Sequence, residues 1–289
     1  MRYIVSKDTL NNNVRLAQQM VGQHRLSLIF KEYYEQLASL LVVPPTGEIF
    51  SVGIKNSVCY ALGLATKRNK AALVNTIGDV HRLRYSGICQ FYIPIDTGDE
   101  REGLPLKEAS CLADTIRKEY GYGVSIKGMV TNGCINDSHP KSRKEWDSVW
   151  RAIHQNVESL SVGGSFWLDK SEQLPDYVSD VRIGRFMLFG YIPYSSERPA
   201  KPCLKLESVV LGINKNAGKI MLDMGDAYCD PLQCIPCEEG LSLMDTSSNY
   251  AVFRTDDTSK YEIGQKLLFI PEYRHSAALA RINVKFDNE

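Results

Sequence analysis

The sequence has no excess of charge of either sign. Over 289 residues, 34 lysines and arginines balance 34 aspartates and glutamates. Proteins that bind nucleic acid usually gather positive charge on one face, and this sequence has neither a basic stripe nor an acidic tail. We therefore expect no nucleic acid partner.

Long apolar runs are also missing. The N-terminal segment MRYIVSKDTLNNN lacks an apolar core of signal-peptide length, and no other run approaches the length of a membrane span. Eight cysteines without a secretion signal are typical of reduced thiols. The sequence thus predicts a cytoplasmic protein without a membrane partner.

Patterns of metal ligands are weak. None of the five histidines has metal-ligand spacing. The segment CDPLQCIPC contains Cys229, Cys234 and Cys237, whose spacing partly matches that of iron–sulfur and zinc sites. A fourth ligand would have to come from elsewhere, such as Cys203. We predict no metal site and favour a proline-rich loop with ordinary thiols.

Apolar runs alternate with helical patterns through the first 200 residues. Helical spacing is present at 34–41, 57–66, 105–119 and 146–153. Strand-like runs lie at 25–30, 49–54, 71–75, 87–95, 124–131, 157–163, 181–185 and 187–191. Alternation of this kind predicts a parallel sheet, and eight units predict a closed α/β barrel of the TIM type, (β/α)8.

The pattern changes near Pro199–Pro202. Beyond it the runs are β-like and no long helix is expected. These runs lie at 206–213, 219–222, 251–254, 266–270 and 279–286. We expect a barrel domain over 1–200 and a β-rich domain, mostly antiparallel, over 201–289.

A cluster of charges follows one of the apolar strands. The run 87–95 stops in Asp96–Gly103, where Arg101 lies among acids and between glycines, and Pro105 then opens a helix. In an α/β barrel, a loop that follows a strand lies on the catalytic face. A solvated loop is the alternative interpretation.

Lysine follows the first barrel strand directly. Lys31 ends the run LSLIFK, where the apolar rim of a barrel would lower its pKa by desolvation and let its neutral amine form a Schiff base. Lys55 also follows an apolar strand and is the competing candidate.

Small and polar residues end three later strands. Ser165 in GGS and the pair Gly184–Arg185 offer a hydroxyl and backbone N–H groups for a phosphate, although each alone is also an ordinary turn. Arg182 would point toward the barrel mouth or form a surface ion pair. Asn132 would donate to a ligand oxygen or cap the next helix.

The order of these pieces resembles the alanine racemase-like family of pyridoxal-phosphate (PLP) enzymes, and most closely its ornithine racemase branch. The matching segments are LSLIFK, IDTGDEREG, GMVTN, VRIGRFMLFG, MLDMGD and LMDTSSNY. They cover about residues 3 to 285 in the family's order. The resemblance implies a barrel of the alanine racemase type with a C-terminal β-rich domain.

The resemblance also implies roles around the cofactor ring. Lys31 would bind PLP covalently and act as one catalytic base. Arg182 would contact the pyridine nitrogen, and Arg101 and Asn132 would lie near the ring oxygen or the substrate carboxylate. An arginine there does not give up its proton, so the nitrogen stays unprotonated, which suits a racemase.

The remaining implied roles concern the phosphate and the second base. Ser165, Gly184 and Arg185 would bind the phosphate, the last two through backbone N–H groups. Tyr250 is the first candidate for the second acid–base group that a two-base racemase needs. Further candidates for that group are Tyr228, Cys229 and Tyr273.

Several functions remain open at this point. We expect an amino-acid racemase whose partner is a small-molecule amino acid, with a basic one such as ornithine or lysine favoured by the resemblance, and a homodimer by analogy. The alternatives are a PLP-binding homeostasis protein without racemase activity, or another PLP reaction, such as a decarboxylase or a D-amino-acid lyase, on the same fold.

Overall fold

The computed structural model describes most of the chain as two compact units. We call Asn13–Met187 with Tyr191–Pro199 the parallel unit, and Met1–Asn12, Leu188–Gly190 and Ala200–Glu289 the antiparallel unit. None of the described helices has the length and apolar character needed to cross a bilayer. The described residues are 1–31, 37, 40–52, 71–85, 87–98, 100, 103–132, 134–135, 139–157, 159–195, 198–227, 229–271 and 284–287.

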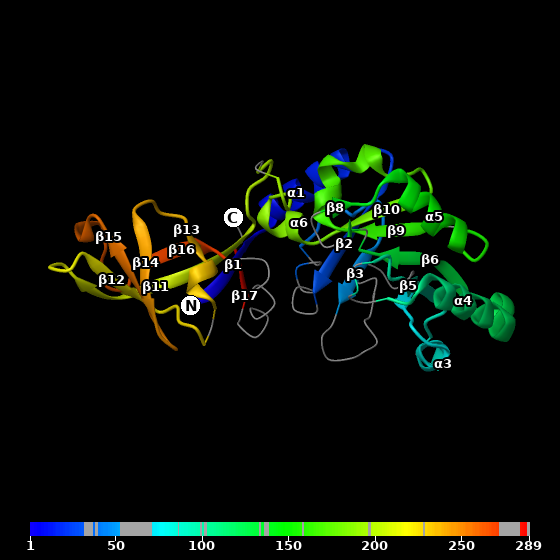
Figure 1. The fold of residues 1–289 in the computed structure, drawn as a ribbon. Helices are drawn as coiled ribbons and strands as arrows, with labels where there is room; N and C mark the ends of the chain where they lie inside the picture. Colours follow the sequence, from blue (N-terminus) through cyan, green and yellow to red (C-terminus); the bar gives the residue numbers. More distant parts are fainter. Residues whose placement is uncertain are drawn as a thin grey trace. The chain divides into compact units, whose positions relative to one another are not determined.

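The parallel unit is built on a sheet that has seven parallel strands in the described part of the chain (Figure 1). Their order is β3-β2-β10-β9-β6-β5-β4. Apart from β3 and β4, which are the two ends of this order, strands of this sheet that follow one another along the chain are neighbours. The last, β10, pairs with the first, β2. This is the order of a barrel opened between β3 and β4. The strands are β2 (Arg25–Lys31), β3 (Ile49–Val52), β4 (Ala71–Leu73), β5 (Gln90–Pro94), β6 (Ser125–Thr131), β9 (Leu160–Gly163) and β10 (Val178–Ile183).

Two of these strands are buried almost throughout, as is typical of a parallel sheet. In β9 every residue is buried, and in β10 only Ser179 is less than fully buried. Sheets covered on both faces have such continuous apolar runs, because helices cross over between strands. The alternating pattern of the sequence therefore predicted this sheet correctly.

Helices α3, α4 and α5 pack side by side along the chain order (Figure 1). In α5, Ser142 and Glu145 form a capping box that satisfies the first backbone N–H groups, and Trp146, Val149 and Ile153 form the buried face. The helices in the described part of the chain are α1 (Lys7–Met20), α3 (Ile77–Tyr85), α4 (Leu106–Tyr120), α5 (Arg143–Ile153) and α6 (Arg185–Phe189).

The sequence did not predict α3. Its start is fixed by Asp79, whose carboxylate accepts from the backbone N–H groups of Asn75 and Thr76, while the Thr76 hydroxyl accepts from Asp79 N at 3.1 Å. The apolar stripe is only two residues, Val80 and Leu83. A stripe this short carries little periodicity, although Thr76 and Asp79 have the spacing of a capping box.

The prediction of an eighth strand over 187–191 is wrong. The segment lies largely in the short helix α6, and Phe186 to Phe189 are all buried. An uninterrupted apolar run has no period, so it does not distinguish a buried strand from a buried helix. The predicted helix over 57–66, and most of the one over 34–41, lie outside the described residues.

The antiparallel unit is organised around the long strand β11 (Leu204–Asn214). β11 pairs with β1 (Arg2–Ser6), β16 (Lys266–Ile270) and β12 (Lys219–Leu222). β1, which lies within the range expected for the barrel domain, pairs with β11 and with β17 of this unit. The other strands are β13 (Ile235–Pro236), β14 (Leu241–Thr246), β15 (Ala251–Thr255) and β17 (Val284–Asp287); β7 (Cys134–Ile135) and β8 (His139–Pro140) form a separate hairpin in the parallel unit.

Alternation of buried and exposed residues shapes this second sheet. In β15, Ala251, Phe253 and Thr255 are buried, and the residues between them are not. The rings of Phe253 and Phe269 contact each other with centroids 5.4 Å apart. The strands predicted at 206–213, 219–222, 251–254 and 266–270 are thereby confirmed, while most of the one at 279–286 lies outside the described residues. Short 3-10 helices lie at Gly121–Gly123, Ser165–Asp169, Ser171–Gln173, Pro231–Gln233 and Thr258–Lys260.

Candidate functional site

The candidate site residues of the parallel unit lie at one edge of its sheet. Parallel strands end at the same edge, and β2 ends at Lys31, β6 at Thr131, β9 at Gly163 and β10 at Ile183. β2, β10, β9 and β6 are consecutive in the sheet. The fold therefore brings together strand ends that are up to about 150 residues apart in sequence, as α/β sheets do at their binding edges.

Arg182 is the best-defined polar group at this edge. Its guanidinium is buried, and Nη1 donates to the carbonyl oxygen of Ser161 at 2.7 Å and to the Ser161 hydroxyl at 2.8 Å. Nη2 donates to the carbonyl oxygen of Thr131 at 2.9 Å. The side chain thus reaches from β10 across β9 to the end of β6.

Gly163 leaves a gap between Arg182 and Asn132. A Cβ at position 163 would lie 3.1 Å from Arg182 Nη2 and 3.4 Å from Asn132 Oδ1. Any side chain here would press on both polar groups. The absence of a side chain keeps a guanidinium and an amide next to each other at the end of β9.

Ser165 connects the loops that follow β9 and β10. Its hydroxyl oxygen accepts from Phe186 N at 3.2 Å, and Gly164 N donates to Arg182 O at 2.9 Å. In the described part of the chain, no acceptor takes the hydroxyl hydrogen of the buried Ser165. That hydroxyl can donate to an anion, next to the backbone of Gly184 and Arg185.

The described start of the predicted charged loop is a turn around Asp96. The Asp96 carboxylate accepts from Gly98 N at 2.8 Å and from Glu100 N at 3.3 Å. Gly98 and Gly103 have φ values of 103° and 120°, which favour glycine. Asp96 therefore shapes the loop, while the predicted Arg101 lies outside the described residues.

Lys141 is a residue of this edge that the sequence did not reveal. It is buried, and its ammonium donates to the carbonyl oxygen of Thr97, whose hydroxyl lies 2.8 Å from the Thr131 hydroxyl. Nearby Lys144 in the same charged segment is exposed. The local sequence therefore carries no signal that separates the two lysines.

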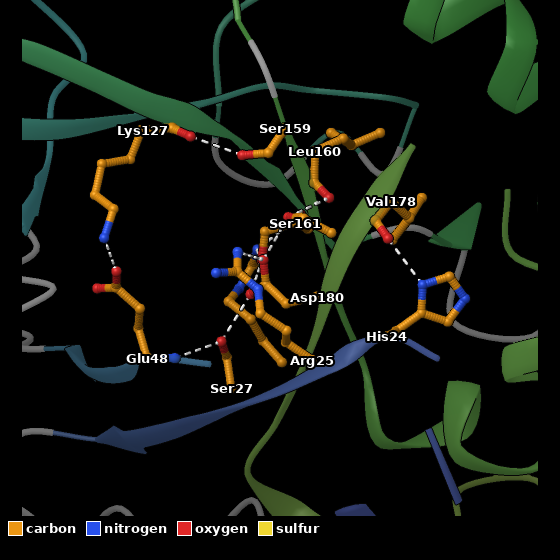
Figure 2. Close-up of polar contacts among 12 residues, drawn as sticks. His24, Arg25, Ser27, Glu48, Lys127, Ser159, Leu160, Ser161, Val178 and Asp180 are labelled. Carbon is orange, nitrogen blue, oxygen red and sulfur yellow. Dashed lines mark hydrogen bonds and ion pairs between the residues drawn. The ribbon is translucent and has the colours of Figure 1, made fainter. Parts of the chain in front are cut away.

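A polar network inside the sheet, formed by residues of β2, β9 and β10, was also not predicted from the sequence (Figure 2). The Asp180 carboxylate accepts from the hydroxyls of Ser27 and Ser161, each at 2.7 Å, and Arg25 lies 3.5 Å away. Asp180 and Arg182 are two residues apart in a strand, so they share a face. That spacing, with serines on the neighbouring apolar strands, is the signal by which the sequence reveals the network.

The charges of this network affect Tyr92 inside the sheet. Burial raises the pKa of the Tyr92 phenol, and the negative charges of Glu48 and Asp180 raise it further. Glu48 also pairs with Lys127 (Figure 2). The interior of the parallel sheet therefore holds ionised groups of both signs close to the candidate site.

Two predicted catalytic residues occupy different units. The backbone of Lys31 pairs with Val52 at the end of β2, as expected, and its side chain lies outside what the structure describes. Tyr250 lies in the turn between β14 and β15 of the antiparallel unit, where its carbonyl oxygen accepts from Ser247 N at 2.9 Å. Its ring is 41% exposed. The further candidates Tyr228 and Tyr273 lie outside the described residues.

The cysteine cluster was tested for metal ligation. Cys229 and Cys234 are buried and their thiols are hydrogen-bonded to each other, which together with burial raises the pKa of Cys234. Cys237 is exposed. Among the residues that the structure describes, no three His, Cys, Asp or Glu side chains come together as a metal site requires.

Solved structures with the same architecture cover nearly the whole chain. An alanine racemase from Clostridium difficile 630 in complex with cycloserine matches with a TM-score of 0.70 at 14% identity, over 100% of this chain and 96% of that one. The chain has the fold of the alanine racemases.

The same fold is shared with enzymes of other names. D-threonine aldolase from Filomicrobium marinum matches with a TM-score of 0.67 at 13% identity, over 99% of this chain and 91% of that one. D-threo-3-hydroxyaspartate dehydratase from Delftia sp. HT23 matches with a TM-score of 0.66 at 15% identity, over 96% of this chain and 91% of that one. No protein-family model matches the sequence. A search of curated proteins finds no match either. The fold of the alanine racemases thus does not select one reaction.

Proposed function

We propose that this protein is a PLP-dependent enzyme that racemises an amino acid at Cα. The observation that carries the proposal is the arrangement of Arg182, Gly163 and Asn132 at the carboxyl edge of a parallel sheet. The fold of the alanine racemases supports it. We also propose that the parallel sheet closes into an α/β barrel of the alanine racemase type, which its strand order supports.

The residues at this edge fit the cofactor. Gly163 keeps the guanidinium of Arg182 and the amide of Asn132 close to each other at the end of β9, and Asn132 would contact a ring oxygen or a carboxylate. The Ser165 hydroxyl would donate to the phosphate, with the backbone N–H groups of Gly184 and Arg185. Two further roles, covalent attachment at Lys31 and a contact from Arg101, are proposed from the sequence resemblance.

The chain's own groups would set the electronics and the geometry. When bound, PLP withdraws electrons from an attached amino acid and makes its Cα–H bond acidic. Arg182 would donate a hydrogen bond to the ring nitrogen and keep its own proton, because a guanidinium does not lose a proton near neutral pH. The nitrogen then stays unprotonated, which favours rapid return of the Cα proton over side reactions.

Two bases on opposite faces of Cα would move the proton. We propose Lys31 for one face and Tyr250 for the other, with the tyrosine supplied within a homodimer. Racemisation requires each enantiomer to lose its proton to one base and receive a proton from the other. A basic substrate such as ornithine or lysine is proposed from the likeness of IDTGDEREG to the ornithine racemase branch.

Exchange of the Cα hydrogen tests this proposal. The protein with added PLP is incubated in deuterium oxide with single enantiomers of ornithine, lysine and alanine. We expect deuterium in the Cα position and appearance of the opposite enantiomer. Tyr250→Phe should slow exchange from one enantiomer at least about 100-fold, in line with general acid–base catalysis.

An exposed tyrosine of the parallel unit provides the matched control. Tyr122 is fully exposed, and Tyr122→Phe should exchange like the wild type. Absence of exchange with every amino acid would contradict a racemase and would favour the cofactor-binding role without catalysis.

A second candidate function follows from the structural neighbours. They include a D-threonine aldolase and a D-threo-3-hydroxyaspartate dehydratase. The alternative is therefore cleavage or dehydration of a D-3-hydroxy amino acid on the same edge. Formation of an aldehyde or a keto acid from these substrates, without the opposite enantiomer, would identify it.

A further inference from the structure

We propose that Asp180 is a positioning residue that holds the guanidinium of Arg182 in place through the hydroxyl of Ser161. The proposal rests on the proposed function, because Arg182 has a task at the ring only if PLP binds at this edge. Asp180, Ser161 and Arg182 are all buried. The Ser161 hydroxyl donates to Asp180 Oδ1 at 2.7 Å, and Arg182 Nη1 donates to the Ser161 hydroxyl oxygen at 2.8 Å.

The Asp180 carboxylate accepts hydrogen bonds from three serine hydroxyls. Ser27 and Ser161 donate to Oδ1, and Ser179 donates to Oδ2, each at 2.7 Å. Figure 2 shows Ser27, Ser161 and Asp180 converging from β2, β9 and β10. An ionised carboxylate only accepts hydrogen bonds, so the hydroxyl hydrogens of Ser27 and Ser161 are directed at it. The Ser179 hydroxyl has the carbonyl oxygen of Leu160, at 3.2 Å, as a second acceptor.

This arrangement fixes the direction of the Ser161 hydroxyl. Its hydrogen is given to Asp180, so its oxygen can only accept, and it accepts from Arg182 Nη1. Without the carboxylate, that hydrogen is free to rotate toward the guanidinium and oppose it. Asp180 therefore determines that Ser161 attracts Arg182.

The guanidinium is held in one orientation as a result. Nη1 contacts both oxygens of Ser161 on β9, and Nη2 contacts Thr131 O on β6. Three contacts on two strands leave a planar group little freedom to rotate. A cofactor ring resting on this edge would meet a donor whose position is set before binding, which lowers the cost of ordering it.

The charge of Asp180 also acts inside the sheet. Its neighbour Arg25 lies 3.5 Å away, but the Arg25 side chain is 49% exposed and is therefore screened by water. Tyr92, on β5, is close enough for the Asp180 charge to help raise its pKa. A buried negative charge on the same face of β10 as Arg182 stabilises the cationic guanidinium through a medium of low dielectric constant.

Three serines offer a matched set of variants. Ser27→Ala, Ser161→Ala and Ser179→Ala each remove one hydroxyl donor from Asp180. Only the Ser161 hydroxyl also contacts Arg182. Asp180→Asn is the fourth variant; it keeps an acceptor oxygen and removes the charge. A purely structural network would respond similarly to all three serine changes.

The readouts are the PLP dissociation constant, from equilibrium dialysis with absorbance detection, and the pH midpoint of the bound cofactor's visible band. We expect Ser161→Ala and Asp180→Asn to raise the dissociation constant about tenfold, equivalent to about 1.4 kcal/mol. Both should move the pH midpoint in the same direction. Ser27→Ala and Ser179→Ala should stay within about twofold of the wild type.

The outcomes separate this proposal from the proposed function. If wild type binds PLP and Ser161→Ala matches Ser179→Ala in both readouts, the positioning role is overturned and the function stands. If wild type binds no PLP, both proposals fall. Circular dichroism checks the fold of each variant, and if Asp180→Asn does not fold, the serine comparison decides alone.

Discussion

The two sheets of this protein bury polar groups in different ways. In the parallel sheet, Ser27, Ser161, Asp180 and Arg182 all lie buried within strands. In the antiparallel sheet, β12 and β15 alternate between buried and less buried residues, and the buried members of β12 are apolar. The antiparallel sheet also buries a charge, at Glu207, but Arg2 and Lys266, which pair with it, keep 32% and 55% of their side chains exposed. In the parallel sheet the buried carboxylate of Asp180 and the buried guanidinium of Arg182 both lie in one strand.

The difference indicates where function lies. Burying a charge is costly unless it is paired and hydrogen-bonded, so a sequence without a use for it replaces it with an apolar residue. The described contacts of Asp180 satisfy its carboxylate with three hydroxyls. A functional role is expected where a charged residue takes a buried position that usually holds an apolar one and is stabilised there by specific hydrogen bonds.

The largest effect on stability is expected in the antiparallel sheet. Phe253 is buried against Phe269, and Phe253→Ala should lower the free energy of unfolding by about 4 kcal/mol through lost burial and a cavity. Urea unfolding followed by circular dichroism measures it. The folded variant should bind PLP with unchanged affinity. A tenfold loss of affinity would show that the parallel unit alone does not form the cofactor site.

Alanine substitution of one glycine in each sheet compares the contributions of the two sheets to PLP binding. The Cβ of Gly163→Ala would lie 3.1 Å from Arg182 Nη2, so the guanidinium must move. We expect PLP affinity to fall about tenfold and stability to fall by about 1 kcal/mol, as for mild overpacking.

Gly212→Ala in β11 is the control for this change. Its Cβ would meet Met221 Cε at 3.5 Å, an ordinary contact, and neither affinity nor stability should fall. Fluorescence titration with PLP compares the two variants. Equal affinities for both would remove Gly163 and Arg182 from the candidate site.

The smallest effect concerns acid stability of the antiparallel sheet. Burial raises the pKa of Glu207, but Arg2 and Lys266 outweigh it and hold the pKa below its ordinary value of 4.5. A lowered folded-state pKa gives stability that is present above the unfolded-state pKa and is lost as pH falls through the folded-state pKa.

Glu207→Gln tests this contribution. The variant should have a lower Tm than wild type at pH 7, and the gap should narrow below about pH 4.5, when Glu207 of the wild type takes up its proton. Thermal unfolding at pH 7 and pH 3.5 compares them. A gap that stays constant between the two pH values would show that the ion pairs contribute nothing.

Strand positions could be predicted from the sequence because periodicity is local. Lys31 was expected at the end of a strand, and the structure places it at the end of β2. The eighth strand was mispredicted because the buried α6 gives the same apolar run as a strand. The local hydrophobic pattern therefore located most strands. It failed at α6, where Phe186 to Phe189 are all apolar and buried and the helical period is lost.

Side-chain contacts could not be predicted because they depend on strand order. Arg182 meets Ser161 and Thr131 only because β10, β9 and β6 are neighbours, which no local pattern encodes. Lys141 reaches Thr97 from a charged segment that reads as solvent-exposed. Asp180 was not predicted because the strand expected from the sequence began at 181, whereas β10 begins at Val178.

Reductive trapping of the cofactor tests the central claim most directly. The purified protein is mixed with PLP, reduced with borohydride and digested, and the modified peptide is sequenced by mass spectrometry alongside Lys31→Ala. We predict a visible band that reduction removes, one modified lysine at position 31, and neither band nor label in the variant. Label on Lys55, Lys127 or Lys141 instead, or no visible band with PLP present, would contradict the account.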